Sequence, residues 1–205
     1  MQIPVACIDD PRLDDYRNIP DPDLLRSRGI FIAEGRHVVR RLLASRFRTR
    51  SILVTATAYD AIRDVDARAG DVRVFVVSQA AMNAITGFNI HRGCQAVGER
   101  PPAARWQDVV RSASLVVVLE RVSNADNVGS IFRSAAAFGA DAVLVGPACA
   151  DPLYRKAIRT SMGAALQVPF AAMPEWPADL AALRNDVAAL TQAHDPDHPS
   201  ARFYN

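Results

Sequence analysis

Cysteine is scarce in this sequence. The 205 residues include three cysteines, Cys7, Cys94 and Cys149, which lie far apart and show no CxxC spacing. An odd number of widely separated thiols does not form a disulfide framework, and structural zinc sites use closer, recurring ligand spacings. We therefore expect reduced thiols, no metal site and a cytoplasmic location.

Long apolar runs are also lacking, although half of the residues are hydrophobic. No uninterrupted apolar stretch approaches the roughly 20 residues that cross a bilayer. Near the N-terminus the sequence places Asp9, Asp10, Asp14 and Asp15, where a secretory signal would have a basic start and an apolar middle. The sequence predicts neither a membrane segment nor a secretory leader.

The common fingerprints of nucleotide and hydrolase chemistry are missing as well. The sequence has neither a GxxxxGK[ST] phosphate loop nor a GxGxxG turn, and it has no recognisable nucleophile elbow. His194 and His198 are four residues apart, but Pro196 and Pro199 exclude the helix that would align them as metal ligands. A hydrolase is therefore disfavoured, and so is a generic nucleotide-binding α/β domain.

Arginine is the abundant charged residue, since the chain has a single lysine. Residues 1–105 hold sixteen arginines against twelve acidic residues, whereas residues 106–205 hold eight basic and ten acidic ones. Six arginines follow one another with no acid between them: Arg36, Arg40, Arg41, Arg46, Arg48 and Arg50. A guanidinium donates paired hydrogen bonds to phosphate, but a solvated helix face gives the same pattern. The cluster fits both an anionic partner and plain solvent exposure.

Two prolines within residues 99–105 indicate a linker, at the point where the charge balance changes. The elements predicted before it are a helix over 31–45, strands over 51–55 and 72–77, a helix beginning at Ser78, a loop over 87–93 and a strand over 94–97. The sequence thus predicts a small α/β domain over residues 1–100 and a linker over 101–106.

Strands and helices alternate more regularly after the linker. The predicted elements are a strand over 115–119, a loop over 120–127, a helix over 128–138 ended by Gly139, a strand over 142–145, helices over 155–165 and 179–184, a strand over 187–191 and a terminal loop over 192–205. The first strand is wholly apolar, which is typical of a parallel sheet covered on both faces. This order predicts right-handed crossovers in a parallel sheet over residues 107–205, so both domains are α/β.

The segment from Glu120 to Arg133 joins the first of these strands to the following helix. Ligands of open α/β sheets bind at this edge. Asn127 is placed to cap the helix, Gly129 to let another backbone approach, and Arg133 to reach an anion from the helix. Helix capping and a solvated arginine explain the same residues without any function.

The sequence Asn-Val-Gly-Ser-Ile-Phe-Arg-Ser-Ala, residues 127–135, resembles the first motif of the SpoU-type RNA methyltransferases of the SPOUT superfamily. The resemblance continues over residues 138–145, 151–164 and 167–170. Upstream, residues 31–35 and 87–93 are similar to the family's N-terminal RNA-binding domain, which is related to small ribosomal proteins. The resemblance covers most of the chain from about residue 31 onward.

This resemblance implies transfer of a methyl group from S-adenosylmethionine to a ribose 2′-hydroxyl of tRNA or rRNA. It implies that Asn127 and Arg133 are catalytic, that Glu120 and Gly129 support the active-site loop, and that the complete protein is a homodimer. Because a guanidinium stays protonated, we expect Arg133 to clamp a phosphate and stabilise the developing alkoxide. The arginines expected to contact RNA are Arg36, Arg40, Arg41, Arg46 and Arg92.

Two later motifs of the family are missing from the sequence: a Gly-x-Glu-x-x-Gly loop, and an Ile-Pro segment followed by Ser-Leu-Asn. In the family they form the knot and bind the cofactor, so the expected fold is a partial SPOUT-type domain with no assigned cofactor residues. We expect a fragment of a longer enzyme. The alternative is a catalytically silent RNA-binding module that keeps the first half of the fold, and binding of the methyl donor separates the two.

Overall fold

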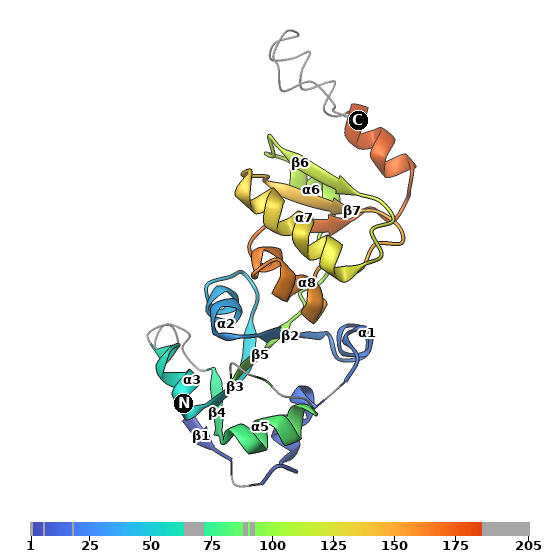
Figure 1. Cartoon of the computed structure of the whole chain (residues 1–205). Coiled ribbons are helices and arrows are strands. Elements are labelled where there is room, and N and C mark those ends of the chain that lie inside the picture. Colours follow the sequence, from blue (N-terminus) through green and yellow to red (C-terminus); the bar gives the residue numbers. More distant parts are fainter. Residues whose placement is uncertain are drawn as a thin grey trace.

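The computed structural model describes residues 2–5, 7–17, 19–63, 72–87, 90 and 93–185, and they form two sheets (Figure 1). The first sheet has the strand order β1-β4-β3-β5-β2, and the second has the order β6-β7-β8. Among the described residues, no helix is long and apolar enough to cross a bilayer. The predicted α/β class is confirmed for both halves of the chain.

The first sheet mixes parallel and antiparallel strands. Its elements, with their helices, are β1 (Gln2–Pro4), η1 (Pro11–Tyr16), α1 (Asp21–Asp23), η2 (Leu24–Arg28), β2 (Ile30–Glu34), α2 (Arg36–Leu43), β3 (Thr49–Thr55), α3 (Ala56–Asp60), β4 (Arg73–Val77), α5 (Gln79–Thr86) and β5 (Cys94–Glu99). Strands β1, β4 and β3 run parallel, whereas β5 is antiparallel to both β3 and β2. The strands expected at 51–55, 72–77 and 94–97 are confirmed, and Ser78 caps α5 as predicted.

One prediction in this half is wrong. Residues 31–34 belong to strand β2, and the helix is confined to Arg36–Leu43. Gly35, with φ 92°, separates the two elements, and its N–H donates to the Cys94 carbonyl at 2.8 Å. The apolar run is buried on both faces, so its sequence has no periodicity that distinguishes a helix from a strand. It forms a strand because its backbone pairs with β5.

The second sheet is parallel throughout. Its elements, with their helices, are α6 (Trp106–Val110), β6 (Val116–Leu119), α7 (Ala125–Ala137), β7 (Ala142–Val145), α8 (Arg155–Thr160), η3 (Ala164–Leu166) and β8 (Phe170–Ala172), and residues 178–185 are helical. The residues of the expected linker before Trp106 form neither helix nor strand. Gly139 adopts the left-handed conformation expected after α7.

Three expectations for this sheet need correction. Strand β6 lies at the edge with β7 as its described neighbour, so Val116–Val118 are half-buried rather than covered on both faces. The helix expected over 155–165 ends at Thr160, because Gly163 has φ 83° and a short 3-10 turn follows. The third described strand is β8, while the predicted strand at 187–191 and the loop at 192–205 lie outside the described residues.

Helix α8 joins the two halves (Figure 1). Ile158 is buried in one core together with Phe31 and Val39 of the first half. Polar contacts reinforce the junction, because the backbone N–H and Nε of Arg155 donate to the Asp21 carboxylate at 2.8 and 2.5 Å. The start of α8 is therefore fixed by a residue of the first half.

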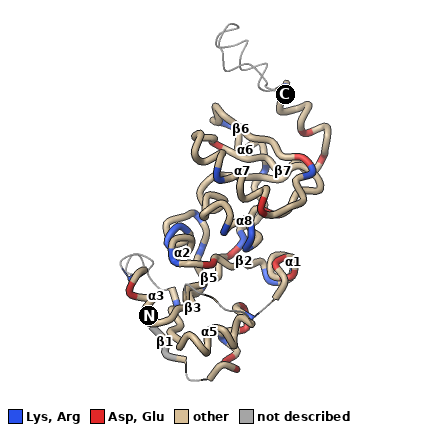
Figure 2. The backbone as a smooth tube through the Cα atoms, viewed as in Figure 1, with Lys and Arg blue, Asp and Glu red and all other residues tan. Residues whose placement is uncertain are grey.

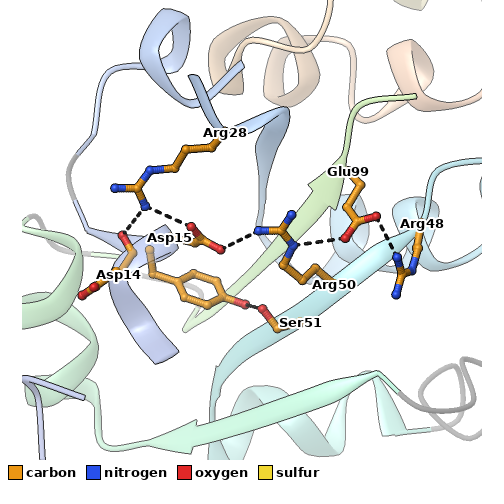
Figure 3. A network of polar contacts seen from close by, with 8 residues as sticks. Asp14, Asp15, Arg28, Arg48, Arg50, Ser51 and Glu99 are labelled. Atoms are coloured by element: carbon orange, nitrogen blue, oxygen red, sulfur yellow. Dashed lines mark hydrogen bonds and ion pairs between the residues drawn. The ribbon is translucent and has the colours of Figure 1, made fainter. Parts of the chain in front are cut away.

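A chain of alternating charges ties the N-terminal segment to the first sheet (Figure 3). It consists of Arg28, Asp15, Arg50, Glu99 and Arg48. Arg50 is the central member, because its guanidinium donates to both Asp15 and Glu99 at 3.1 Å. Since Asp15 is in η1, Arg50 in β3 and Glu99 in β5, the network fixes the 3-10 helix against the sheet.

Candidate active-site loop and the helix pair that supports it

The loops after β6 and β7 are bonded to each other. The Arg121 N–H donates to the Pro147 carbonyl at 3.0 Å, and the Ala150 N–H donates to the Val122 carbonyl at 2.9 Å. Arg121 has φ 56°, a left-handed backbone that lets the chain turn sharply out of β6. These bonds fix the path of the loop that contains Glu120, whose side chain is exposed.

Helix α7 begins three residues earlier than the sequence predicted, and its cap is Asn124 rather than Asn127. The Asn124 side chain accepts a hydrogen bond from the Asp126 N–H at 2.8 Å. Asn127 lies within the first turn, and its side chain is exposed to solvent. Asn124 is itself a preferred capping residue, and this preference could have identified the true cap from the sequence. Asn127 therefore does not cap the helix.

Gly129 occupies the crossing of α7 and α8. A Cβ at this position would be 2.5 Å from the Ala157 carbonyl oxygen and 2.9 Å from Thr160 Cβ. The predicted close approach of another backbone is thus observed, and the backbone is that of α8. Only glycine allows the two helices to lie at this separation without a shift.

Asp126 of α7 bonds two residues of α8, Lys156 and Thr160, and we call this contact the Asp126 bracket. Its carboxylate accepts a hydrogen bond from Thr160 Oγ1 at 2.8 Å and pairs with Lys156 Nζ at 2.8 Å. The hydrogen bonds from Lys156 and Thr160 hold the pKa of Asp126 below its usual value. Sequence reasoning missed this bracket, because an acid at the start of one helix does not reveal its partners on another.

Arg133 lies on the exposed face of α7, opposite the buried Val128, Phe132 and Ala135. In the described part of the chain, no hydrogen bond or ion pair joins it to Asn127 or Glu120. Six residues separate it from Asn127, which corresponds to about 9 Å along the helix axis. The two side chains are therefore presented to solvent from one helix, and neither is bonded to another of the described residues.

Three of the arginines expected to contact RNA have partners inside the protein. Arg40 Nη1 donates to the Ala61 carbonyl at 3.1 Å, and Arg41 Nη1 donates to the Met162 carbonyl at 3.0 Å. The Arg46 guanidinium lies 5.1 Å from the ring centroid of Phe47 and 5.6 Å from that of Phe170, at cation–π distance.

The same group of arginines includes Arg36 and Arg92. Arg36 is exposed at the first position of α2, whereas Arg92 lies outside the described residues. Basic positions nonetheless gather on α2 and around α8, where the two halves meet (Figure 2). This junction therefore presents positive charge, part of which also holds the halves together.

The site so assembled has the chemistry of an anion-binding surface. It presents a protonated guanidinium and a carboxamide on one helix, beside a bonded loop at the carboxyl edge of a parallel sheet. Among the described residues, no group of three or more His, Cys, Asp or Glu side chains could hold a metal ion. Helix α7 is held against α8 by the contacts of Gly129 and Asp126.

The fold is that of the SpoU-type methyltransferases. An AdoMet-bound rRNA methyltransferase from Sinorhizobium meliloti superposes with a TM-score of 0.69 at 20% identity, over 83% of this chain and 64% of that one. The AdoMet complex of the SpoU methyltransferase AviRb from Streptomyces viridochromogenes gives 0.70 at 22% identity, over 89% and 69%. Because both sequence identities are low, these superpositions show a shared fold and nothing more.

Sequence comparison identifies a family segment in the second half of the chain. Residues 114–203 match the SpoU rRNA Methylase family and form a SpoU-type segment, which confirms the recognition made from residues 127–135. An uncharacterised tRNA/rRNA methyltransferase of Mycobacterium tuberculosis is 43% identical over 180 residues, 86% of this chain and 62% of that protein. A 23S rRNA guanosine-2′-O-methyltransferase of Bacillus subtilis is 25% identical over 77% of this chain and 60% of its own length.

The chain thus spans about three fifths of the length of these curated relatives. The loop after β7 packs closely against neighbouring residues. After β7, a Cβ on Gly146 would be 2.7 Å from the Leu119 carbonyl oxygen and 3.2 Å from the Trp176 ring, so this loop is closed by protein atoms.

Proposed function

We propose that this chain forms the RNA-binding domain and the active-site loop of an S-adenosylmethionine-dependent methyltransferase that modifies a ribose 2′-hydroxyl of tRNA or rRNA. The observation that carries the proposal is the exposure of Arg133 on α7, because the resemblance of residues 127–135 implies that this arginine is catalytic. The relatives support the same activity, because they are named as tRNA/rRNA methyltransferases and one as a 2′-O-methyltransferase.

The chain's own residues would act on the nucleophile. A ribose hydroxyl hardly ionises at neutral pH, so negative charge develops on its oxygen as it attacks. Arg133 would clamp the adjacent phosphate and stabilise that charge, because its guanidinium remains protonated. Asn127 would orient the ribose, while Glu120 and Gly129 would maintain the loop and its helix. S-adenosylmethionine would supply the methyl group when bound.

The same proposal includes the organisation and the partners of the protein. The RNA-binding domain would comprise residues 1–100 and the methyltransferase segment residues 107–205, with 101–106 as the linker. RNA would be held by its backbone through the N-terminal arginines. The complete enzyme would act in the cytoplasm as a homodimer.

A second candidate is a catalytically silent RNA-binding module. It is favoured by one observation, the lack in this sequence of the two later motifs that bind the cofactor in the family. Such a module would bind structured RNA and would bind no methyl donor.

Calorimetric titration of S-adenosylmethionine and S-adenosylhomocysteine into the 205-residue chain distinguishes the candidates. The same chain is then incubated with tritiated S-adenosylmethionine and total rRNA or tRNA, and digested RNA is analysed for 2′-O-methylnucleosides. Saturable binding and labelled 2′-O-methylnucleosides support the enzyme. RNA binding with no donor binding supports the silent module, and the absence of both overturns the two candidates together.

A further inference from the structure

Strands β3 and β4 are parallel neighbours, but the helices that follow them cover opposite faces of the sheet. Helix α3 buries Ala58 in the core that contains Ile52. Helix α5 buries Met82 in the other core, which contains Leu53. When adjacent parallel strands send their helices to opposite faces, a crevice opens beyond their carboxyl ends, and such crevices bind ligands in open α/β sheets.

The structure has a cavity of about 480 Å³ at this point. Its lining includes Arg36, Thr55, Ala56, Ser78, Gln79 and Gly93. The volume lies within the range of small-molecule sites and is large enough for a nucleotide rather than for a phosphate alone. The cavity belongs to the first half of the chain and is separate from the loop and helix that contain Arg133.

The polar groups around the cavity are suited to an anion. Arg36 is exposed at its rim, and none of the described residues that line it is acidic. Thr55 Oγ1 and Ser78 Oγ accept hydrogen bonds from backbone N–H groups at 3.3 and 3.1 Å, so each hydroxyl keeps its own hydrogen to donate. Helix α5 begins at Gln79 and adds the partial positive charge of its N-terminus.

The walls of the cavity are held in place by the fold. A Cβ on Gly93 would lie 2.5 Å from Thr55 Oγ1, so glycine there lets the Thr55 hydroxyl stay at the cavity wall. The Thr55 N–H also donates to the Gly93 carbonyl at 2.9 Å. Gln79 Nε2 donates to Asn83 Oδ1 at 2.9 Å and to the Ile90 carbonyl at 3.1 Å, which fixes the opposite wall. A site built this rigidly loses little entropy when a ligand binds.

We propose that this cavity binds one unpaired nucleotide of the RNA strand, remote from the nucleotide presented to Arg133. The phosphate would lie between Arg36 and the N-terminus of α5, and the nucleoside would lie against the apolar lining formed by Ala56, Ala58 and Val77. The proposal rests on the proposed function in taking RNA as the ligand. It adds a second point of attachment, which would orient the RNA relative to the active-site loop.

The test uses fluorescein-labelled single-stranded oligouridylate with the 205-residue chain, without any methyl donor. Arg36→Gln should weaken binding about tenfold and lower the slope of log affinity against log salt by about 0.7, the value for one contact to a single strand. Arg36→Lys should recover part of the affinity, because it keeps the charge without the planar fork. Ala56→Glu should also weaken binding, since it adds a repelling charge where an acid suits the first turn of α3.

Arg73→Gln is the matched control, because Arg73 is an exposed arginine at the opposite end of β4. It should change the affinity less than about twofold. In amide NMR spectra the oligonucleotide should shift Thr57, Ser78, Gln79 and Gly93, and uridine monophosphate should shift the same amides much more weakly.

Equal effects of Arg36→Gln and Arg73→Gln, or shifts confined to other amides, would overturn the cavity assignment. Saturation by uridine monophosphate without binding of the oligonucleotide would overturn RNA as its ligand. Both results leave the proposed methyl transfer to be judged by its own assay, because no step here depends on the methyl donor.

Discussion

Gly129 on α7 faces the backbone of Ala157 on α8, and a Cβ added to Gly129 would lie 2.5 Å from the Ala157 carbonyl oxygen. This contact links the exposed Arg133 to the rest of the molecule, because α7 rests on α8 at that point. Helix α8 is in turn bonded to Asp21 through Arg155. The position of Arg133 therefore depends on residues of both halves of the chain.

Gly129→Ala should destabilise the protein although alanine is the better helix former. Alanine gains up to about 1 kcal/mol of helix propensity, whereas overpacking against a backbone carbonyl costs about 1–3 kcal/mol. We expect a net loss of stability, measured as a lower urea midpoint. Ser130→Ala on the exposed side of the same helix is the control and should stay within about 0.5 kcal/mol of wild type. A midpoint at or above that of wild type for Gly129→Ala would show that the helices separate at little cost.

Asp126 should make the contact between α7 and α8 sensitive to acid. Hydrogen bonds from Lys156 and Thr160 hold its folded-state pKa below the usual 3.8. A lowered folded-state pKa contributes stability above the unfolded-state pKa, and this contribution is lost as the pH falls through the folded-state value. Asp126→Asn should therefore lower the urea midpoint at neutral pH. Its difference from wild type should shrink as the pH falls below 3.8 and vanish once the carboxyl group is protonated in both states.

The control for this experiment is Asp108→Asn, which removes an exposed ion pair with Arg111. Exposed pairs contribute little, so its midpoint should follow wild type at every pH. A difference between wild type and Asp126→Asn that persists unchanged in acid would contradict an ionic origin.

The sequence predicted best those elements for which the local residue pattern and the tertiary packing favour the same secondary structure. The strand at 142–145 is apolar and lies between Asp141 and Gly146, and it was placed correctly. The run at 31–33 is also apolar, but its strand pairing comes from β5, whose paired residues are more than sixty positions away along the chain. When pairing with a distant strand determines the secondary structure, the sequence of a short apolar run does not distinguish a strand from a helix.

The site was predictable to a similar extent. Positions 127–135 could be recognised because the motif is local, whereas the cap at Asn124 and the bracket at Asp126 depend on the exact start of α7. The arginine cluster illustrates the limit of composition. Arg41 donates to Met162, which is 121 residues away, so no local pattern could reveal that this arginine has a structural partner.

Asp21→Ala should loosen the junction between the two halves. It removes a carboxylate that accepts two hydrogen bonds from Arg155, whose side chain is largely buried. Hydrogen bonds to charged groups contribute about 1.5–3 kcal/mol, so a loss of about 2 kcal/mol is expected. Asp23→Ala, an exposed residue of the same short helix, should have little effect.

Two probes distinguish loosening from general destabilisation. Both tryptophans, Trp106 and Trp176, pack in a core of the second half of the chain, so their fluorescence reports on that half. Far-UV circular dichroism reports on the whole chain. For Asp21→Ala the two unfolding curves should separate, while for wild type they should coincide. Coincident curves in the variant would show that the shared core alone keeps the halves cooperative.

Arg50→Met should detach the N-terminal segment from the sheet. Arg50 bonds both Asp15 and Glu99, and its side chain is only one-third exposed, whereas Arg48 at the end of the network is 80% exposed. We expect a loss of about 1–3 kcal/mol for Arg50→Met and at most about 1 kcal/mol for Arg48→Met. Limited proteolysis of the first twenty or so residues should accelerate in Arg50→Met alone. Equal cleavage rates in both variants would refute a central role for Arg50.

In a complete version of the enzyme, Arg133→Ala should abolish methyl transfer while leaving the fold intact. The side chain is exposed and has no hydrogen-bond or ion-pair partner to lose within the described residues, so the melting temperature should be unchanged. Removing a group that stabilises developing charge lowers the rate by about 100-fold or more. The control is Arg111→Ala, an exposed arginine on the same half of the chain, which should retain full activity. The measurement is tritium transfer from S-adenosylmethionine to rRNA, together with the affinity of each variant for RNA. Full transfer by Arg133→Ala would remove this residue from the catalytic assignment, whereas loss of RNA affinity in parallel with transfer would assign it to binding alone.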